Sequence, residues 1–395
     1  MRLAVLTCGM LPIPAVQGGA VENLIDFYLE YNDRKKIHHI TVYSPWDVKV
    51  KENTSISSDV NHYCYIDVTS IKARIERRIY KYFHKNEYYN YFIEYYFEKV
   101  YSDLKNKKYD YILLENSPGL AYKLSERGYK NILLHLHNDL LNSHSHCHNE
   151  IAKNIIKVIT VSNYIKKSVS TVYPFKNIYT VYNGIDTMMF SQKDKSIVRR
   201  QDLAFSEDDF IMVFSGRINK DKGISELIDA MLEIQEIPNI KLLVLGSTFF
   251  DTPKQENEFF KNLRKKSEII KRNIIFTGFI PYEKVPRYLQ LADIAVLPSM
   301  WNEPFGLTIV EAMAAGLPLI TTRSGGIPEI CEGVATIVDR ENIVEHLTDA
   351  ILDLYHHPDK RKQMANTSIE RAKMFDKEIY TKNFFAALED LKGNC

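Results

Sequence analysis

Residues 297–316, with the sequence LPSMWNEPFGLTIVEAMAAG, decide how the rest of the chain is interpreted. They begin at the end of a short apolar run, 294–297, which is typical of a buried strand and closes at Pro298. Pro304 then predicts the first turn of a helix, where its missing N–H group costs nothing. Apolar residues recur at helical spacing after it, and the helix should end before Gly316. The stretch therefore predicts a strand, a loop and a helix.

The start of this helix is a predicted anion site. The first N–H groups of a helix are unpaired and carry the positive end of its dipole, and Gly306 lets the backbone approach a ligand closely. In an open α/β sheet such a helix begins at the carboxyl ends of the strands, where ligands bind. Glu303 and Glu311 flank the site. Because carboxylates repel phosphate, they suit neutral hydroxyl groups on each side of it, as in a nucleotide sugar. An ordinary amphipathic helix with two solvated glutamates is the alternative.

The segment Glu303-Pro304-Phe305-Gly306, with Glu311 after it, resembles the paired-glutamate motif of the retaining glycosyltransferases of family 4, which have the GT-B fold. The resemblance implies that Glu303 contacts hydroxyl groups of the donor sugar and that Glu311 contacts the ribose. It also implies that the diphosphate is held by backbone N–H groups of Phe305, Gly306 and Leu307. The implied co-substrate is a nucleoside diphosphate sugar, with no other cofactor and no catalytic metal.

Composition narrows the class of protein. A chain of 395 residues is long enough for two domains with substantial cores. The net charge of +1 argues against a nucleic-acid binder that works by bulk charge. No signal peptide is visible, and no stretch approaches the ~20 apolar residues that a membrane span needs. Five scattered cysteines fit a reducing compartment. We therefore expect a cytoplasmic protein.

Two glycines follow the first predicted strand, residues 2–7. Gly18 and Gly19 precede a helical pattern, and a strand, a glycine-rich turn and a helix are a layout that binds phosphate. The full G-x-G-x-x-G pattern is missing, which disfavours a Rossmann dehydrogenase, and a tight turn alone explains two glycines equally well. The resemblance implies that Gly18 and Gly19 meet the donor diphosphate and the acceptor.

Two cations follow the strand predicted at 210–215. Arg217 and Lys222 lie on a strand-to-helix loop, where they suit a diphosphate, although solvated loop cations are an alternative. The pattern Gly-Arg-x-x-x-x-Lys-Gly resembles the diphosphate clamp of the family. The resemblance further implies that the backbone near Ile280 holds the nucleobase, and that the loop 324–329 lies on the sugar side.

Five histidines lie between residues 135 and 148. Strand alternation puts His135 and His137 on one face, with His137 at the carboxyl end of its strand. The spacings fit no standard four-ligand zinc pattern, so we expect a solvent-exposed, histidine-rich acceptor loop, with metal binding as the alternative. The resemblance implies that His137 lies beside the donor sugar.

The segment 48–108 resembles nothing in the family. Within it, Ile71, Ile75, Ile79 and Tyr82 form a stripe at helical spacing, and six basic residues between 72 and 85 oppose a single glutamate. Six cations minus one carboxylate give a local charge of +5. An aromatic run follows at 88–97. A basic amphipathic helix followed by aromatic residues suits the surface of an anionic membrane, whereas a solvated basic helix packed on the domain is the alternative.

Strands alternate with helices in both halves of the chain, which predicts two doubly wound, Rossmann-like α/β domains with parallel sheets. The GT-B resemblance implies that they face each other across a cleft. We predict an acceptor-binding domain over 1–190, a donor-binding domain over 191–375 and a helix over 376–395 that packs back on the first domain, with a linker within 187–206.

The predicted function is transfer of a hexose, with retained anomeric configuration, from a nucleoside diphosphate sugar such as a UDP-sugar to a saccharide or lipid-linked saccharide. Such a reaction would serve surface polysaccharide or glycoconjugate synthesis, at the inner face of the cell membrane. The catalytic set would be His137, Glu303, Arg217 and Lys222. Two alternatives are a nucleotide-sugar epimerase of the same fold and a non-catalytic subunit that binds sugar nucleotides.

Overall fold

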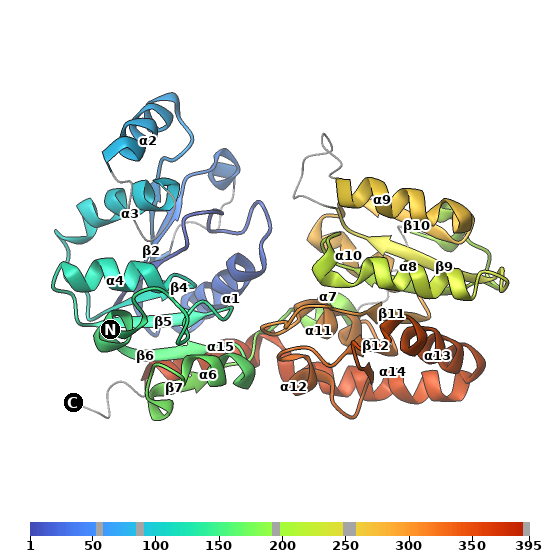
Figure 1. Cartoon of the computed structure of the whole chain (residues 1–395). Helices are drawn as coiled ribbons and strands as arrows, with labels where there is room; N and C mark the ends of the chain where they lie inside the picture. Colours follow the sequence, from blue (N-terminus) through green and yellow to red (C-terminus); the bar gives the residue numbers. More distant parts are fainter. Residues whose placement is uncertain (53–57, 84–90, 192–197, 248–257, 390–395) are drawn as a thin grey trace. The chain divides into compact units, whose positions relative to one another are not determined.

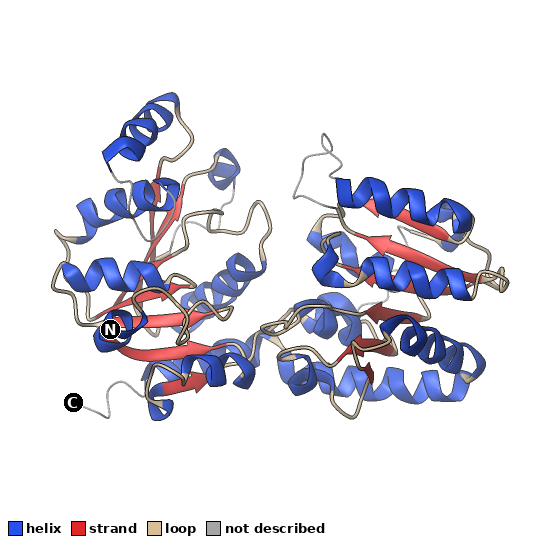
Figure 2. Ribbon diagram, in the orientation of Figure 1, coloured by secondary structure: helices blue, strands red, loops and turns tan. Residues whose placement is uncertain are grey.

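The computed structural model describes residues 1–52, 58–83, 91–191, 198–247 and 258–389. The chain divides into two compact units (Figure 1). Unit 1 comprises Met1–Gly184 and Lys377–Cys395, and unit 2 comprises Ile185–Asp376. Each unit is a parallel sheet with helices packed against it (Figure 2).

Unit 1 has a seven-stranded sheet in the order β3-β2-β1-β4-β5-β6-β7. The strands are β1 (Arg2–Leu6), β2 (His39–Pro45), β3 (Asn61–Ile66), β4 (Tyr111–Glu115), β5 (Ile132–Leu136), β6 (Ile155–Thr160) and β7 (Ile178–Thr180). The helices are α1 (Ala20–Lys35), α2 (Ile71–Phe83), α3 (Tyr91–Leu104), α4 (Pro118–Glu126), α5 (His148–Asn154), α6 (Asn163–Val169) and α15 (Lys377–Glu389).

Unit 2 has a six-stranded sheet in the order β10-β9-β8-β11-β12-β13. The strands are β8 (Phe210–Ser215), β9 (Ile240–Leu245), β10 (Ile274–Gly278), β11 (Ile294–Leu297), β12 (Leu319–Thr322) and β13 (Thr336–Val338). The helices are α7 (Thr187–Ser191), α8 (Ile224–Glu233), α9 (Glu258–Ser267), α10 (Val285–Leu289), α11 (Leu307–Ala314), α12 (Ile327–Cys331), α13 (Ile343–His356) and α14 (Pro358–Ala372).

Both sheets confirm the predicted doubly wound topology. Every pairing between neighbouring strands is parallel. Central strands such as β1, β8 and β11 are apolar along their length and buried, because helices cover both faces of a parallel sheet. In each unit the strand order reverses once, between β1 and β4 and between β8 and β11. Ligands of such sheets bind where the order reverses, at the carboxyl ends of these strands.

Two boundaries predicted from the sequence need correction, and parts of two predicted segments lie outside the described residues. The helix predicted to start near Pro304 starts at Leu307, because Gly306 has φ 112° and its left-handed backbone ends the preceding loop. The predicted linker is partly helical: α7 lies within it, and Phe190 is fully buried against Tyr282. Residues 84–90 of the predicted basic and aromatic segment and residues 192–197 of the predicted linker lie outside the described residues.

The described helices are all too short or too polar to cross a bilayer.

Helix α15 completes the core of unit 1. Phe384 is fully buried and stacks on Tyr28 of α1, with ring centroids 4.5 Å apart and planes 10° from parallel. Phe385 and Leu388 are buried in the same cluster, which also contains Leu3 and Val5 of β1. Residues from both ends of the chain therefore form one apolar core.

We predict that Phe384→Ala destabilises unit 1 by about 3–5 kcal/mol, because it removes a fully buried ring and leaves a cavity. Asn383→Ala, at an exposed position of the same helix, is the control and should change stability by less than about 0.5 kcal/mol. Denaturant unfolding followed by circular dichroism measures both. Equal stabilities of the two variants would contradict the assigned role of α15.

Candidate active site

The loops that follow β8 and β11 meet where the strand order of unit 2 reverses. The loop after β8 ends at Gly223, which has φ 70° and precedes α8. A Cβ atom at Gly223 would lie 1.9 Å from the carbonyl oxygen of Pro298, which follows β11. The backbone N–H of Met300 also donates to the carbonyl oxygen of Asp221 over 2.8 Å. Glycine is therefore required where these two loops touch.

Glu303 is the centre of this meeting point. Its carboxylate forms an ion pair with Lys222, and the hydroxyl of Ser299 donates to Glu303 Oε1 over 2.9 Å. The glutamate side chain is almost completely buried. A third loop holds its backbone: Gly326 N–H donates to the carbonyl oxygen of Glu303 over 2.7 Å, and a Cβ at Gly325 would lie 2.2 Å from the same oxygen. Three loops thus fix one carboxylate.

Arg217 differs from its predicted partner Lys222. Its side chain is exposed and has no hydrogen bond or ion pair with the described residues. Lys222 is mostly buried; besides Glu303, its ammonium group lies 5.9 Å from the centre of the Trp301 ring. The two cations share a loop, but of the two only Lys222 is fixed by contacts of its side chain with described residues.

The start of α11 borders the same place. Gly306 is the N-cap residue, and no side chain caps the helix. The N–H groups of Leu307 and Thr308, the first two of α11, are therefore open to a ligand, whereas that of Ile309 donates to the carbonyl oxygen of Gly306 over 3.0 Å. Phe305 is buried and packs edge-on against Phe375, with centroids 5.7 Å apart, so it anchors the loop. A small pocket here is lined by Lys222, Ser299, Glu303, Gly306 and Thr308, among others. The structure therefore brings the predicted Lys222, Glu303 and Gly306 together.

Glu311 lies in the second turn of α11 and is buried. Burial raises the pKa of its carboxyl group to about 7, against the opposing effect of a hydrogen bond with the hydroxyl of Tyr282. Ile280, predicted to lie near the nucleobase, is half-buried in the loop between β10 and Tyr282. A carboxyl group with this pKa carries part of its charge at neutral pH, and it suits a neutral hydroxyl partner.

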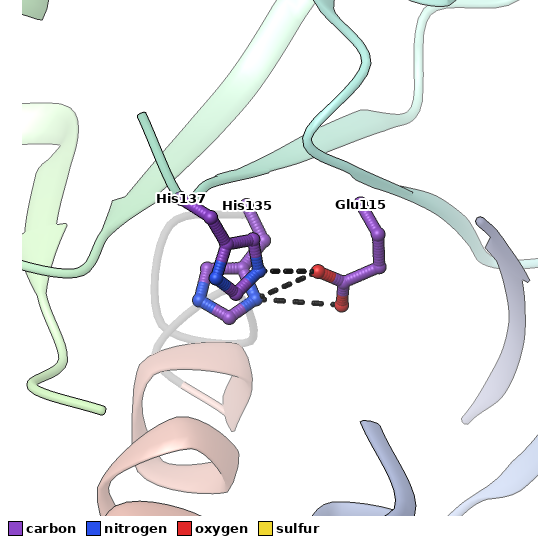
Figure 3. A group of neighbouring side chains, drawn as sticks. All are labelled: Glu115, His135 and His137. Carbon is purple, nitrogen blue, oxygen red and sulfur yellow. Dashed lines mark hydrogen bonds and ion pairs between the residues drawn. The ribbon is translucent and has the colours of Figure 1, made fainter. Parts of the chain in front are cut away.

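Unit 1 has a second polar cluster where its own strand order reverses (Figure 3). Glu115 ends β4, and both His135 of β5 and His137 just after it point toward the carboxylate. His135 Nδ1 lies 3.0 Å and His137 Nε2 2.9 Å from Glu115 Oε2. The hydroxyl of Tyr28 donates to Glu115 Oε1 over 3.1 Å. The prediction that the two histidines share a face is confirmed, but the expected exposure is wrong, because both are buried.

The cluster fixes the protonation of His137. Burial alone would raise the pKa of Glu115, but His135 and His137 outweigh it and lower that pKa to about 2. Burial, with His135 nearby, lowers the pKa of His137 to about 4. Because an ionised carboxylate only accepts, neutral His137 must donate through Nε2. Its Nδ1 is then an acceptor, and this buried atom has no hydrogen-bond partner among the described residues.

Glu115, His135 and His137 are also close enough to bind a metal ion. A metal-bound histidine normally donates its second ring N–H to a carboxylate or a carbonyl group. Here the outer nitrogens, His135 Nε2 and His137 Nδ1, meet no such acceptor within the described ranges. The arrangement therefore fits a hydrogen-bonded network better than a metal centre. The other histidines, His144, His146 and His148, lie in the loop before α5 and at its start.

Gly18 and Gly19 lie in the loop before α1, with φ 75° and 117°. A Cβ at Gly19 would lie 2.1 Å from Glu22 Oε2, so glycine leaves room for this carboxylate. Burial and the charge of Glu115 raise the pKa of Glu22 to about 7. Gly19 thus borders the carboxylate of Glu22, whereas a Cβ at Gly18 would meet nothing within 4 Å.

Sequence reasoning missed Ser299, Glu115 and Tyr28 as members of these clusters. For two of these residues, the sequence contained a signal of a functional role. Glu115 is a carboxylate at the end of an otherwise apolar strand, and Ser299 is the second residue after another. Tyr28 had no local signal, because its place in the apolar stripe of α1 explains it as core.

Comparison with known proteins agrees with this architecture. HepE of Anabaena, in a crystal structure with UDP-glucose, superposes with a TM-score of 0.74 at 20% identity and covers 100% of both chains. Two curated relatives come from Bacillus subtilis: the putative glycosyltransferase YtcC, 29% identical over 97% of this chain and 85% of its own, and spore coat protein SA, 27% identical over 94% of each.

Two parallel α/β units with this strand order define the GT-B class of glycosyltransferase fold. Residues 196–371, almost the whole of unit 2, match the family model of glycosyl transferases group 1. Over unit 2 the chain is therefore similar to the group 1 glycosyltransferases, and the putative glycosyltransferase YtcC resembles it over almost its whole length.

We predict that Glu311 makes the stability of unit 2 depend on pH. Its pKa of about 7 lies above the ordinary 4.5, so the folded state keeps a proton that the unfolded state loses in this interval. Stability contributed by this group therefore falls as pH rises from 4.5 to 7. Glu311→Gln abolishes the effect, so the variant should gain roughly 3 kcal/mol over the parent at pH 8 and little at pH 4.5.

Denaturant unfolding of unit 2 at the two pH values measures the difference. The control is Glu283→Gln, at an exposed position near Tyr282. A constant difference between Glu311→Gln and the parent across this range would show that folding leaves the pKa of this carboxyl group unchanged, which contradicts the prediction.

Proposed function

We propose that this protein is a glycosyltransferase, namely a retaining, family 4 hexosyltransferase that uses a UDP-hexose as donor and a saccharide or lipid-linked saccharide as acceptor. The fixed carboxylate of Glu303 beside Lys222, next to the uncapped start of α11, is the observation that carries the proposal. A cation and helix N–H groups suit the diphosphate, and the carboxylate suits the sugar hydroxyls next to it. The crystal structure of HepE with UDP-glucose supports a UDP-sugar as the donor.

Donor binding exchanges contacts at Glu303. Lys222 forms an ion pair with the buried carboxylate and neutralises it. When the diphosphate arrives, Lys222 gains a second anionic partner, and Glu303 becomes available to accept from sugar hydroxyl groups. Ser299 keeps one oxygen of Glu303 in place, so the side chain is oriented before the sugar arrives.

The chemical step breaks the bond between the anomeric carbon and the diphosphate oxygen. An acceptor hydroxyl attacks from the same face, and the departing phosphate oxygen takes its proton. Negative charge grows on the leaving group, where Lys222, Arg217 and the start of α11 stabilise it. Because these groups supply the positive charge, we propose that the transfer needs no divalent metal.

In this proposal, His137 binds a hydroxyl group of the sugar. Glu115 fixes its ring, and its Nδ1 acceptor lacks a partner among the described residues, so it suits a sugar hydroxyl donor. A donor-sugar hydroxyl group that donates to His137 is held in place, while the acceptor hydroxyl group passes its proton to the departing phosphate oxygen. Glu115 acts as a positioning residue for His137.

Donor screening followed by product analysis tests the function. Thermal shifts with UDP, UDP-hexoses and GDP-hexoses should single out a UDP-hexose, since a ligand at 100 times its dissociation constant adds about 2.7 kcal/mol of stability. Glu303→Gln should keep the shift given by UDP and lose most of the extra shift given by the hexose. Transfer to a saccharide acceptor in excess chelator should then give a product with the donor's anomeric configuration.

Three results would reject this function. Epimerised nucleotide sugar without added acceptor indicates an epimerase. Donor binding without any product indicates a binding subunit. Activity lost in chelator and restored by magnesium or manganese refutes metal independence.

We predict that Lys222→Ala and Arg217→Ala each lower turnover by about 10²–10³, because each removes a group that stabilises the leaving diphosphate. The double change should be less than additive, since both cations serve one diphosphate. Lys220→Ala, an exposed cation of the same loop, is the matched control. Steady-state kinetics with folding checked by circular dichroism measure the effects. An increase in the donor KM alone would assign the pair to ground-state binding.

A further inference from the structure

Helix α2 turns its apolar side toward solvent. Ile71, Ile75 and Ile79 follow one another every fourth residue and are 77%, 53% and 53% exposed. Tyr82 and Phe83, at the end of the helix, are 73% and 79% exposed. These five side chains form what we call the α2 stripe. Residues spaced by four lie on one side of a helix, so the stripe is continuous.

The opposite side of α2 packs on the protein. Ala73 is the one described residue of the helix that is buried. Glu76 accepts from the hydroxyl of Tyr95 over 2.9 Å and forms an ion pair with Lys99 at 2.7 Å, and both partners belong to α3. The ring of Tyr80 meets that of Tyr95 edge-on at 6.4 Å. A surface helix ordinarily packs with its apolar side inward. Helix α2 is held by polar and aromatic contacts instead, and its apolar stripe is left uncovered.

Basic residues border the stripe. Lys72, Arg74, Arg78 and Lys81 are all exposed. The helix 71–83 carries five basic residues and one glutamate, so five minus one gives a charge of +4. That single glutamate, Glu76, is turned toward α3. Glu76 also forms an ion pair with Lys72 at 4.0 Å, and the solvent side of α2 combines large apolar side chains with a net positive charge.

We infer that the α2 stripe docks unit 1 on a bilayer that contains anionic phospholipids. Apolar side chains enter the boundary between headgroups and acyl chains, and the flanking cations meet lipid phosphates. A second copy of this chain is a poorer occupant, because it would place a helix of charge +4 against an identical one. A helix of 13 residues is too short to cross a membrane, so α2 lies along its surface.

This docking goes beyond the proposed sugar transfer and does not depend on it. It concerns residues of α2 alone, none of which belongs to the clusters around Glu303 or Glu115. A vesicle-binding assay therefore reads it out independently of any activity.

Sedimentation with vesicles tests the docking. The full chain should bind vesicles of phosphatidylcholine that contain about 30–40% phosphatidylglycerol. Its binding to vesicles of pure phosphatidylcholine should be weaker by at least about tenfold. High salt should weaken the binding, because it screens the lipid charge. Each basic residue near the surface contributes about fivefold, so Arg74→Glu with Arg78→Glu should lower partitioning by at least about 25-fold. Ile75→Glu with Ile79→Glu should also abolish binding.

Matched controls lie on unit 2. Lys261→Glu with Lys265→Glu reverses two exposed cations four residues apart on α9, and Ile269→Glu changes an exposed isoleucine. Both should leave binding within about twofold of the parent. Equal binding to neutral vesicles, no binding to anionic ones, or an equal loss in the controls overturns the inference. A dimer that the Ile75→Glu, Ile79→Glu variant abolishes, measured by analytical ultracentrifugation without vesicles, also overturns it in favour of a second copy.

Discussion

The ion pair between Lys222 and Glu303 is the contact on which unit 2 depends at its ligand-binding end. A nearly buried carboxylate without a cation costs several kcal/mol, so the loop that carries Lys222 must stay against the loop that carries Glu303. Contacts with the backbone also hold these loops together. Gly223 leaves space for the carbonyl group of Pro298, and Ser324 Oγ donates to the carbonyl oxygen of Ser299 over 2.9 Å. The ends of β8, β11 and β12 are therefore held as one rigid group.

Unit 1 also stabilises a buried carboxylate, but it does so with different side chains. Its carboxylate, Glu115, also lies where the strand order reverses, but two imidazoles and a tyrosine hydroxyl stabilise it in place of a lysine. A lysine keeps its full charge at neutral pH, whereas the imidazole of His137 is neutral there. Unit 2 thus offers a fixed cation, suited to phosphate, and unit 1 offers a neutral acceptor nitrogen, suited to hydroxyl groups. The same topology supports two kinds of recognition.

The sequence was sufficient for the parallel topology and for the grouping of Lys222, Glu303 and Gly306, because apolar strands, glycines and charged loop residues have local signals. It was not sufficient for the start of α11, where the left-handed backbone of Gly306 outweighed the helix signal of Pro304. The burial of His135 and His137 was also missed, since it depends on Phe384, whose ring lies 5.4 Å from His135 although it is distant in sequence. For α2, the sequence left open whether the helix lies on a membrane surface or is a solvated helix packed on the domain. The contacts of Glu76 with α3 and the exposed isoleucines show which side of the helix faces outward.

The place of α15 has a consequence for the order in which the chain acquires structure during translation. Unit 2 is continuous, so the ribosome releases everything it needs by residue 376. Unit 1 is interrupted, and Tyr28 and Leu24 meet Phe384 and Leu388 only after the whole of unit 2 has been made. Domains usually fold from the N-terminus onward as they emerge. Here the segment made first completes its core only after unit 2 has been made, so the apolar side chains of α1 that pack on α15 lack these contacts in the meantime.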